Sequence, residues 1–331
     1  MEDIARLAGT ARSTVSRALS NSASVSEATR TRIREIARSL NYSVNIGAKN
    51  LRCGENRTVG VVVPVNPAAH QPISDPFLLS LIGGLADAVT ERGMDMLLTR
   101  VDAGNADAVA YQYNSGRAMG IIIIGDTLRP EQLLQLAERR VPIVTWGAQL
   151  PGAHCTTVGT DNRKGGALAT SHLLEQGCQR IVFLGDRAVP EVAQRSEGYA
   201  ASLRAAGLPV LPELHADVPF QPAAARAAIA GLVARGLRFD GIVAASDVLA
   251  MAAICALAEC GLQVPADVLV VGYDDIPESA YFHPPLTTIR QPVAQAGCQL
   301  LEGLLQAVGQ AAPASRVLPT LLVVRDTSRR R

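Results

Sequence analysis

Polar and basic side chains crowd one short stretch of the chain, residues 9–30, which reads GTARSTVSRALSNSASVSEATR. Ser and Thr hydroxyls can cap helices or bind phosphate oxygens, and Arg can bind phosphate or the edge of a guanine base. Residue types alone therefore allow a flexible surface linker or a surface that contacts a partner. The elements that position these side chains decide between the two interpretations.

Basic charge is concentrated at the same end of the chain. Residues 1–57 contain ten Lys and Arg against five Asp and Glu (+5), and residues 58–331 contain 21 against 25 (−4), although the whole chain of 331 residues has a formal net charge of only +1. This asymmetry favours an N-terminal module that binds phosphate. A solvated basic helix face would give the same count.

Short helices are predicted within residues 1–44, at residues 3–8, at residues 13–20 and from Ser26 onward. Gly9 ends the first helix, and Ser26 is a favourable N-cap for the third. The second helix turns its apolar side chains inward, namely Val15, Ala18 and Leu19. Two short helices joined by a turn that contains Gly are a helix-turn-helix candidate. The polar connector that follows is too short to fold alone.

From residue 58 onward, short apolar strands alternate with helical patterns. The strands are predicted at residues 58–65, 95–101, 120–125, 142–147, 180–186, 239–246 and 267–275. Residues 77–92 repeat Leu, Ile and Val at helical spacing. This alternation indicates parallel sheets that are covered on both faces, and the number of units indicates two sheets. The expected fold class is α/β, with an all-α helix-turn-helix headpiece followed by two doubly wound parallel-sheet subdomains.

Polar residues follow several of these strands at the point where each strand ends. They are Gly125-Asp126, Trp146-Gly147, Ser246-Asp247 and Tyr273-Asp274-Asp275. Ligands of open α/β sheets bind outside the carboxyl ends of the strands. These residues therefore indicate a ligand site, which would be a cleft if two sheets face each other.

Composition and motifs argue against several other classes of protein. Hydrophobic residues make up 48% of the chain, which is typical of a soluble globular protein. The Cys and His residues show no metal-ligand or disulfide spacing, and the sequence has no P-loop, G-x-S-x-G or G-x-G-x-x-G motif. The first residues, MEDIARLAG, do not resemble a signal peptide, and no apolar run approaches about 18 residues. We therefore expect a cytoplasmic protein without a metal, a cofactor, a membrane span or an enzyme activity.

Segments along the whole chain are similar to the lactose/galactose repressor family of bacterial transcription factors. They are DIARLAG, STVSRALS, VSEATRTRI, LNY, RTVGVVVP, SDPF, VGTDNRKGG, HLLEQGCQRIVFLGD, RSEGY, ASDVLAMAAICAL, GLQVPADVLVVGYDD and PPLTTIRQP. The resemblance implies a homodimeric regulator whose core resembles a periplasmic sugar-binding protein. It implies a headpiece (1–44), a hinge helix or linker (45–57) and a core (58–331), divided into an N-subdomain (about 58–158 and 290–317) and a C-subdomain (about 159–289 and 318–331).

The resemblance also implies that the second helix lies in the major groove of a pseudo-palindromic, double-stranded operator. Arg12, Ser13 and Arg17 match positions that read bases in the family, and an Arg bidentate to guanine gives about 1–3 kcal/mol of discrimination. For both arginines the alternative is solvation or phosphate contact. Short polar side chains suited to phosphate are Thr14, Ser16, Ser20, Ser24, Ser26 and Asn45, with helix capping as an alternative or additional role.

In the connector, Leu51 matches a Leu that wedges into the minor groove at the centre of the operator, and Ala48 matches its neighbour. The alternative for Leu51 is packing on the core. The sequence differs from the family in two places here. Val44 stands where a Pro usually precedes Asn45, and Gly47 lowers helix propensity by about 1 kcal/mol relative to Ala.

An effector site in the cleft is a further implication of the resemblance. The residues that match it are Asp75, Phe77, Arg195, Phe220, Ser246, Asp247 and Asp274, with Arg100 and Asp126 as weaker candidates at other strand ends. Aromatic faces combined with Asp and Arg suit a polyol. Gly147 stands where many members place an Asp, so Trp146 is expected to supply stacking instead, or else to belong to the core. Helix capping is the alternative for Asp247.

The expected function is repression of carbohydrate-utilisation genes under the control of a small sugar-type effector. A nucleoside or purine effector is the alternative. A solute receptor without DNA function is disfavoured by the basic headpiece and by the absence of a signal peptide, and an enzyme on the same scaffold is disfavoured by the missing motifs.

Overall fold

The structure of the chain is a computed structural model, which describes residues 1–20, 22–40, 42, 56–65, 72–102, 104–125, 130–149 and 155–329. The chain divides into two compact units, residues 1–56 and residues 57–331.

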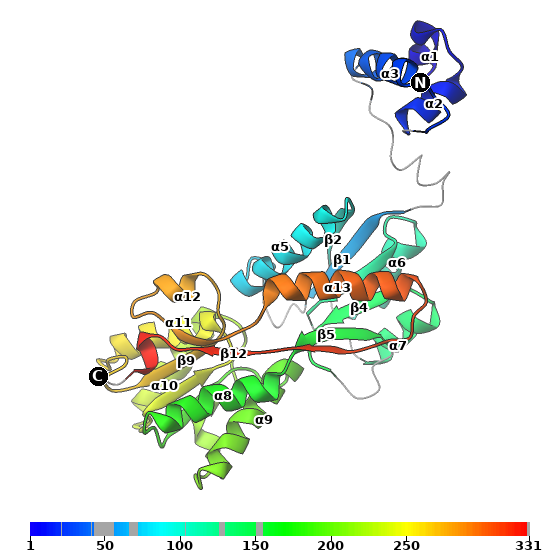
Figure 1. Cartoon of the computed structure of the whole chain (residues 1–331). Coiled ribbons are helices and arrows are strands. Elements are labelled where there is room, and N and C mark those ends of the chain that lie inside the picture. Colours follow the sequence, from blue (N-terminus) through cyan, green and yellow to red (C-terminus); the bar gives the residue numbers. More distant parts are fainter. Residues whose placement is uncertain are drawn as a thin grey trace. The chain divides into compact units, whose positions relative to one another are not determined.

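The first unit is built from the helices α1 (Glu2–Ala8), α2 (Arg12–Leu19) and α3 (Glu27–Ser39) (Figure 1). Gly9 ends α1 in the left-handed conformation, with φ of 61°, which Gly adopts without steric cost. Helices this short are marginal alone, so their stability comes from packing. The buried residues of α1, α2 and α3 form one apolar core with Val25, and Val15 and Ile33 have no solvent-exposed area. Full burial of such a side chain contributes about 1.5–3 kcal/mol.

The described part of the second unit contains two sheets. The first is parallel and runs in the order β11-β5-β4-β3-β1-β2. Its strands are β1 (Thr58–Val65), β2 (Asp95–Asp102), β3 (Gly120–Ile124), β4 (Ile143–Trp146), β5 (Thr156–Thr160) and β11 (Arg316–Leu318). Its helices are α5 (Pro76–Glu91), α6 (Ala106–Asn114), α7 (Pro130–Glu138) and α13 (Val293–Val308).

The side chains of β1 point alternately to the two faces of the sheet, and this explains how helices cover both faces. Val59 and Val61 pack into one apolar cluster with α5 and α13, whereas Val62 packs into another with α6 and α7. Successive strand residues point to opposite faces, so a run of Val buries both. The arrangement is the doubly wound sheet that the sequence predicts.

The second sheet runs in the order β12-β10-β9-β8-β6-β7, and β12 pairs antiparallel with β10. Its strands are β6 (Ile181–Leu184), β7 (His215–Ala216), β8 (Gly241–Ala244), β9 (Leu269–Asp274), β10 (Thr287–Arg290) and β12 (Leu321–Val323). Its helices are α8 (Asn162–Glu175), α9 (Pro190–Ala205), α10 (Pro222–Ala234), α11 (Asp247–Glu259) and the short α12 (Glu278–Tyr281). One continuous apolar cluster joins the helices to the strands.

The chain crosses between the two sheets at several points. β5 of the first sheet leads to α8 of the second, β10 of the second leads to α13 of the first, and β11 leads to β12 (Figure 1). These crossover segments hold the two halves of the core together. They are also the places at which the halves can rotate relative to each other.

The seven strands predicted from sequence are all present, with ends that differ by up to two residues. The seven predicted strands do not include β5, β7, β10, β11 or β12, the last of which has three residues. β7 and β11 are two and three residues long, and β5 and β10, TTVGT and TTIR, are rich in Thr. Such segments lack a continuous apolar run and form strands because a neighbouring strand pairs with them.

Candidate nucleic-acid interface and ligand cleft

One face of α2 presents polar side chains, and the opposite face is buried. Residues 12, 13, 16, 17 and 20 share the outer face at helical spacing, while Val15 and Ala18 have no exposed area. Arg12, Ser13, Arg17 and Ser20 are exposed, and Thr14 and Ser16 are half-buried. The helix therefore offers guanidinium and hydroxyl groups to solvent as one strip.

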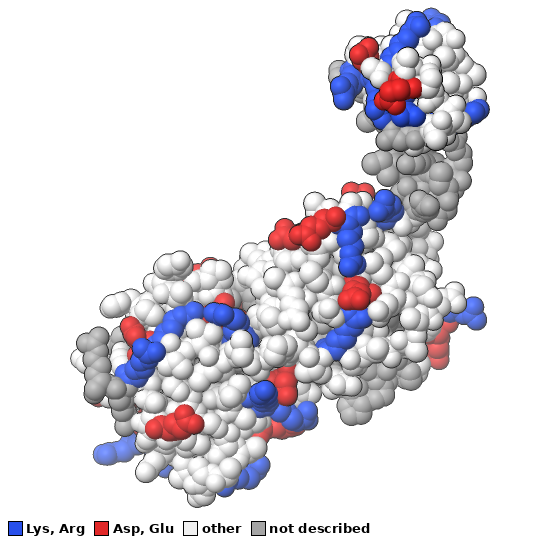
Figure 2. Space-filling view, in the orientation of Figure 1, with Lys and Arg blue, Asp and Glu red and all other residues white. Residues whose placement is uncertain are grey.

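The two arginines of this strip are available to a partner. Arg12 forms an ion pair with Glu2 at 3.3 Å, but both side chains are largely exposed, and such pairs contribute little. Within the described part of the chain, the Arg17 side chain makes no hydrogen bond or ion pair. Basic side chains reach the visible face of the headpiece at more places than acidic ones (Figure 2). An anionic partner would meet few competing contacts here.

The neighbouring hydroxyls form local hydrogen bonds. Ser26 caps α3 by accepting from the Thr29 amide at 3.4 Å. Ser20 donates to the Ser16 carbonyl at 2.6 Å, and Ser24 lies 2.9 Å from the Ser22 hydroxyl. The capping alternative is thus present for Ser26. A hydroxyl that donates one hydrogen bond keeps lone pairs, so these contacts do not prevent a second partner.

Arg30 is a positioning residue that sequence reasoning missed. Its half-buried guanidinium donates to the carbonyls of Ser22 and Val25, at 3.1 and 2.9 Å, and so fixes the turn between α2 and α3. Nothing in its sequence context separates it from the other arginines of α3. The predicted hinge residues Asn45, Ala48 and Leu51 lie outside the described residues.

An open cavity lies where the carboxyl ends of the two sheets face each other. Its lining from the first sheet and its helices is Asp75, Phe77, Leu78, Gly125 and Trp146. Its lining from the second is Val189, Glu191, Arg195, Phe220, Ser246 and Asp274. The combination of aromatic, apolar and charged side chains in this lining suits a small molecule such as a mono- or disaccharide or a nucleoside.

Aromatic rings form the first-sheet wall of the cavity. The Asp75 carboxylate accepts hydrogen bonds from the Phe77 and Leu78 amides, at 3.1 and 3.2 Å, and thereby caps α5 and fixes Phe77 at its first turn. The rings of Phe77 and Trp146 lie 6.1 Å apart between centroids. Trp146 is only 7% exposed and packs in the apolar core as well as lining the cavity, so its core role is present, whereas stacking on an effector stays a prediction.

Charged groups form the opposite wall. The buried Arg195 guanidinium donates to Asn162 Oδ1 at 2.9 Å and to the Ala245 carbonyl at 2.5 Å, and it lies 3.7 Å over the Tyr273 ring. Asp274 Oδ1 accepts from Gln291 Nε2 at 2.7 Å. Burial raises the pKa of Asp274 well above its ordinary value, and the nearby Arg195 opposes this effect.

The Asp274 carboxyl is connected to the crossover segments. Gln291, which holds Asp274, accepts a hydrogen bond at 2.8 Å from the Thr160 hydroxyl through its other side-chain atom. Thr160 ends β5 and Gln291 follows β10, so both lie where the chain passes between the sheets. A ligand that contacts Asp274 therefore acts on groups that link the two halves of the core.

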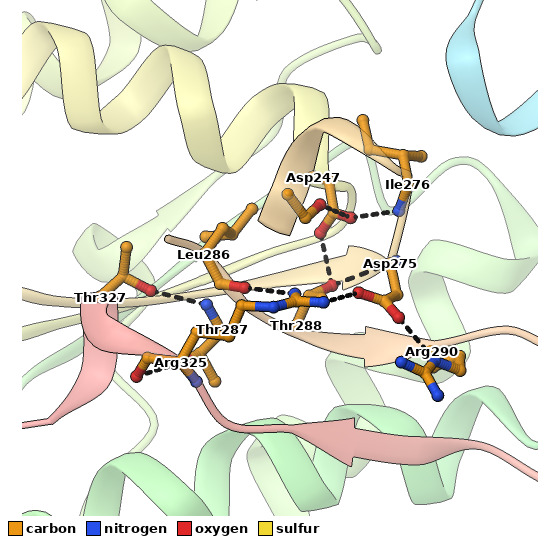
Figure 3. A network of polar contacts seen from close by, with 10 residues as sticks. Asp247, Asp275, Ile276, Leu286, Thr287, Thr288, Arg290, Arg325 and Thr327 are labelled. Carbon is orange, nitrogen blue, oxygen red and sulfur yellow. Dashed lines mark hydrogen bonds and ion pairs between the residues drawn. The ribbon is translucent and has the colours of Figure 1, made fainter. Parts of the chain in front are cut away.

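Asp247 lies away from the cavity, in a buried polar network (Figure 3). Its carboxylate accepts hydrogen bonds from the Ile276 amide at 2.9 Å and from the hydroxyls of Ser279 and Thr288 at 2.6 and 2.5 Å. The cap of α11 is instead its neighbour Ser246, which also lines the cavity. Asp247 therefore links the end of β9, α12 and β10 through hydrogen bonds.

The same network anchors the C-terminal segment. Arg325 donates to Asp275 Oδ1 at 2.6 Å and to the Leu286 carbonyl at 2.7 Å, and Arg290 donates to Asp275 Oδ2 at 2.6 Å (Figure 3). These contacts hold the end of β9, where Asp274 has φ of 118°, a conformation that non-Gly residues rarely adopt. The network therefore fixes the unusual backbone that directs Asp274 into the cavity.

Two further candidates do not join the cavity lining. Arg100 is exposed on β2, at the edge of the first sheet. Asp126 lies outside the described residues. Sequence reasoning named Tyr273 only as part of a strand end that indicates a ligand site, and it did not single out Glu191, Asn162 or Gln291. Asn162, Tyr273 and Gln291 stand in segments that carry the family resemblance, whereas Glu191 carried no sequence signal.

The described residues contain no group of His, Cys, Asp and Glu that could hold a metal ion. Among the described helices, none is both long and apolar enough to span a membrane.

Comparison with known proteins gives matches over both units. The description "Bacterial regulatory proteins, lacI family" matches residues 1–45, and "Periplasmic binding protein-like domain" matches residues 170–328. The HTH-type transcriptional regulator CelR of Thermobifida fusca is 32% identical over 333 residues, which cover 99% of this chain and 97% of CelR.

Two solved structures share the fold over nearly the whole chain. A transcriptional regulator CelR–cellobiose complex is 30% identical, with a TM-score of 0.73 and coverage of 98% of both chains. The lac repressor dimer bound to operator and the anti-inducer ONPF is 24% identical, with a TM-score of 0.87 and coverage of 98% of both chains. The chain therefore belongs to the lacI family of bacterial regulatory proteins, which are DNA-binding transcription regulators and not enzymes.

Proposed function

We propose that the protein is a repressor of carbohydrate-utilisation genes that binds a pseudo-palindromic operator as a homodimer and responds to a neutral sugar in the cleft. The observation that carries the proposal is the chemistry of the cavity, in which the rings of Phe77 and Trp146 face Arg195 and Asp274. Apolar sugar faces stack on aromatic rings, while hydroxyls pair with carboxylate and guanidinium groups. The related CelR complex with cellobiose supports the same class of effector.

In this proposal Arg12, Ser13 and Arg17 read bases, and the hydroxyls of α2 and its flanking turns contact phosphates. The first amides of an α-helix lack intrahelical partners and favour anions, so the N-terminus of α2 suits an approach to DNA. The predicted hinge residues complete this interface. A solved lac repressor dimer on operator supports both the dimer and the partner.

Effector binding would control DNA affinity through the crossover segments. A sugar that contacts both halves of the cleft favours one relative orientation of the two sheets, and the chain Asp274–Gln291–Thr160 connects that contact to the crossovers. To change operator occupancy from about 99:1 to about 1:99, the effector must prefer one state by about 5.5 kcal/mol. Several hydrogen bonds in each of two protomers can supply this difference.

A nucleoside or purine is the second candidate effector. The observation that favours it is the same aromatic wall, because the rings of Phe77 and Trp146 can also stack on a planar base. The two candidates differ in shape, so one panel of compounds separates them.

The test is a thermal-shift screen of the full-length protein with cellobiose, ribose, cytidine and hypoxanthine. A compound bound only by the native state at 100 times its Kd stabilises it by about 2.7 kcal/mol, so an effector raises the unfolding midpoint. Phe77→Ala should abolish the shift, whereas Tyr281→Ala, an exposed aromatic outside the cavity, should keep it. A base that stabilises the protein when no sugar does would refute the sugar proposal.

A further inference from the structure

Glu191, in the first turn of α9, brings a carboxylate into the cavity from the second half of the core. Its Oε1 accepts a hydrogen bond from the Ala148 amide at 2.8 Å. Ala148 follows β4 and so belongs to the first half. One carboxylate oxygen therefore joins the two walls of the cleft.

Gly147 provides the space for this contact. A Cβ built on Gly147 would lie 2.5 Å from Glu191 Oε1, closer than real Cβ atoms approach other atoms. The end of β4 thus has no side chain at the point where the carboxylate from α9 sits. A side chain at position 147 would therefore displace the Glu191 carboxylate, the flexible end of that side chain, from the Ala148 amide.

The charges of the described lining suit a ligand that donates hydrogen bonds and carries no negative charge. The described lining contains one cation, Arg195, and three carboxyl groups, those of Asp75, Glu191 and Asp274, and burial raises the pKa of the last of these. Carboxylates accept hydrogen bonds and donate none when ionised, so they pair with hydroxyls. Among the described residues, no group donates to the second oxygen of Glu191, whereas Arg195 is already held by Asn162 and Ala245.

We propose that Glu191 is a specificity-determining residue of the cleft. The Ala148 amide holds its Oε1, and its Oε2 accepts a hydrogen bond from a hydroxyl of a neutral, polyhydroxylated ligand. Gly147 and Glu191 form a complementary pair, in which one position must be small because the other supplies the carboxylate. This inference rests on the proposed function, in that the cleft is taken to bind the effector.

The first test uses stability without any ligand. Gly147→Asp, Glu191→Ser and the double variant form a cycle in the full-length protein, with the exposed Glu197→Ser on the same helix as a control. Gly147→Asp should lower the unfolding midpoint much less when Glu191 is also replaced by Ser. Any strain from the Gly147 φ of 158° is the same in both backgrounds and cancels in the cycle. An equal loss in both backgrounds would overturn the pairing.

The second test measures binding of cellobiose, and in parallel of ribose and glucose 6-phosphate, by isothermal titration calorimetry. Glu191→Ser should weaken binding of the neutral sugar by about tenfold, while Glu197→Ser should not change it. The double variant, with its carboxylate returned from position 147, should regain most of the affinity. The phosphorylated sugar should bind more weakly than the neutral one.

Unchanged sugar affinity in Glu191→Ser overturns the role of Glu191 and leaves the proposed sugar function intact. If the unsubstituted protein binds neither neutral sugar, the proposed sugar function fails and so does this role of Glu191 toward sugars. The stability cycle then still decides whether positions 147 and 191 are complementary.

Discussion

Asp247→Asn should flatten the pH dependence of stability of the core without weakening effector binding. Asp247 is fully buried, and burial raises its pKa from 3.8 to about 7, although Ser279, Thr288 and the Ile276 amide donate hydrogen bonds to it. The native state therefore binds this proton more tightly than the unfolded chain does. The contribution of the group to stability is fully present below about pH 4 and is lost as the pH rises through about 7.

The magnitude follows from the difference between the two pKa values. A shift of one pKa unit corresponds to about 1.4 kcal/mol, so the full titration of Asp247 changes the free energy of unfolding by about 4 kcal/mol. Roughly half of this change, about 2 kcal/mol, falls between about pH 5 and about pH 7.5. Asn does not titrate, so this part of the slope should disappear. Some pH dependence of stability should remain in this variant, because burial also raises the pKa of Asp274.

The assay is urea unfolding at several pH values, followed by the fluorescence of Trp146, the only Trp and a residue of the core. Asp95→Asn, at an exposed position on β2, serves as the control and should leave the slope unchanged. Parallel pH profiles for Asp247→Asn and the unsubstituted protein would refute the reasoning. A loss of effector affinity in Asp247→Asn with stability unchanged would instead assign Asp247 to the binding site.

The remaining predictions concern the headpiece and the packing of the core. Arg17→Ala should reduce the preference for operator over random DNA about tenfold or more in fluorescence anisotropy, whereas an equal loss on both DNAs would place Arg17 on phosphate. Ser26→Ala should destabilise the headpiece by about 1 kcal/mol in thermal unfolding followed by circular dichroism, and an unchanged midpoint would contradict its role as a cap. Gly166→Ala should destabilise the core by about 2 kcal/mol or more, because its Cβ would overlap the Arg195 backbone carbonyl. Gly231→Ala, whose Cβ would meet no other atom, is the control and should not destabilise the core, and a similar loss in both variants would contradict the close packing of α8 on α9.

Local patterns in the sequence predicted the elements that depend on few neighbours. Gly9 and Ser26 mark helix ends through their own backbone and side-chain chemistry, and both do so in the structure. The strand at residues 58–65 is a continuous apolar run, and such a run is buried in any parallel sheet. β5 and β10 lack this signal, since Thr-rich segments become strands only where another strand pairs with them.

Adjacent residues in the cleft show where local reasoning ends. Ser246 and Asp247 follow the same strand, yet Ser246 lines the cavity and Asp247 faces the buried network. The direction in which α11 leaves β8 determines which of the two side chains reaches the cleft. The rule that ligands bind at the carboxyl ends of parallel strands identifies the region of the site, but it does not tell which side chains line the cavity.

The sequence by itself determined the helix-turn-helix headpiece, the doubly wound sheets and the edge of the sheets at which a ligand would bind, because periodicity, capping and strand-end position are local properties of the chain. Only the tertiary structure decided that Glu191 reaches the space beside Gly147, or that Gln291 joins Asp274 to Thr160. These contacts join residues from different sheets or crossover segments. Their meeting depends on how the two halves of the core pack, which no short window of sequence contains.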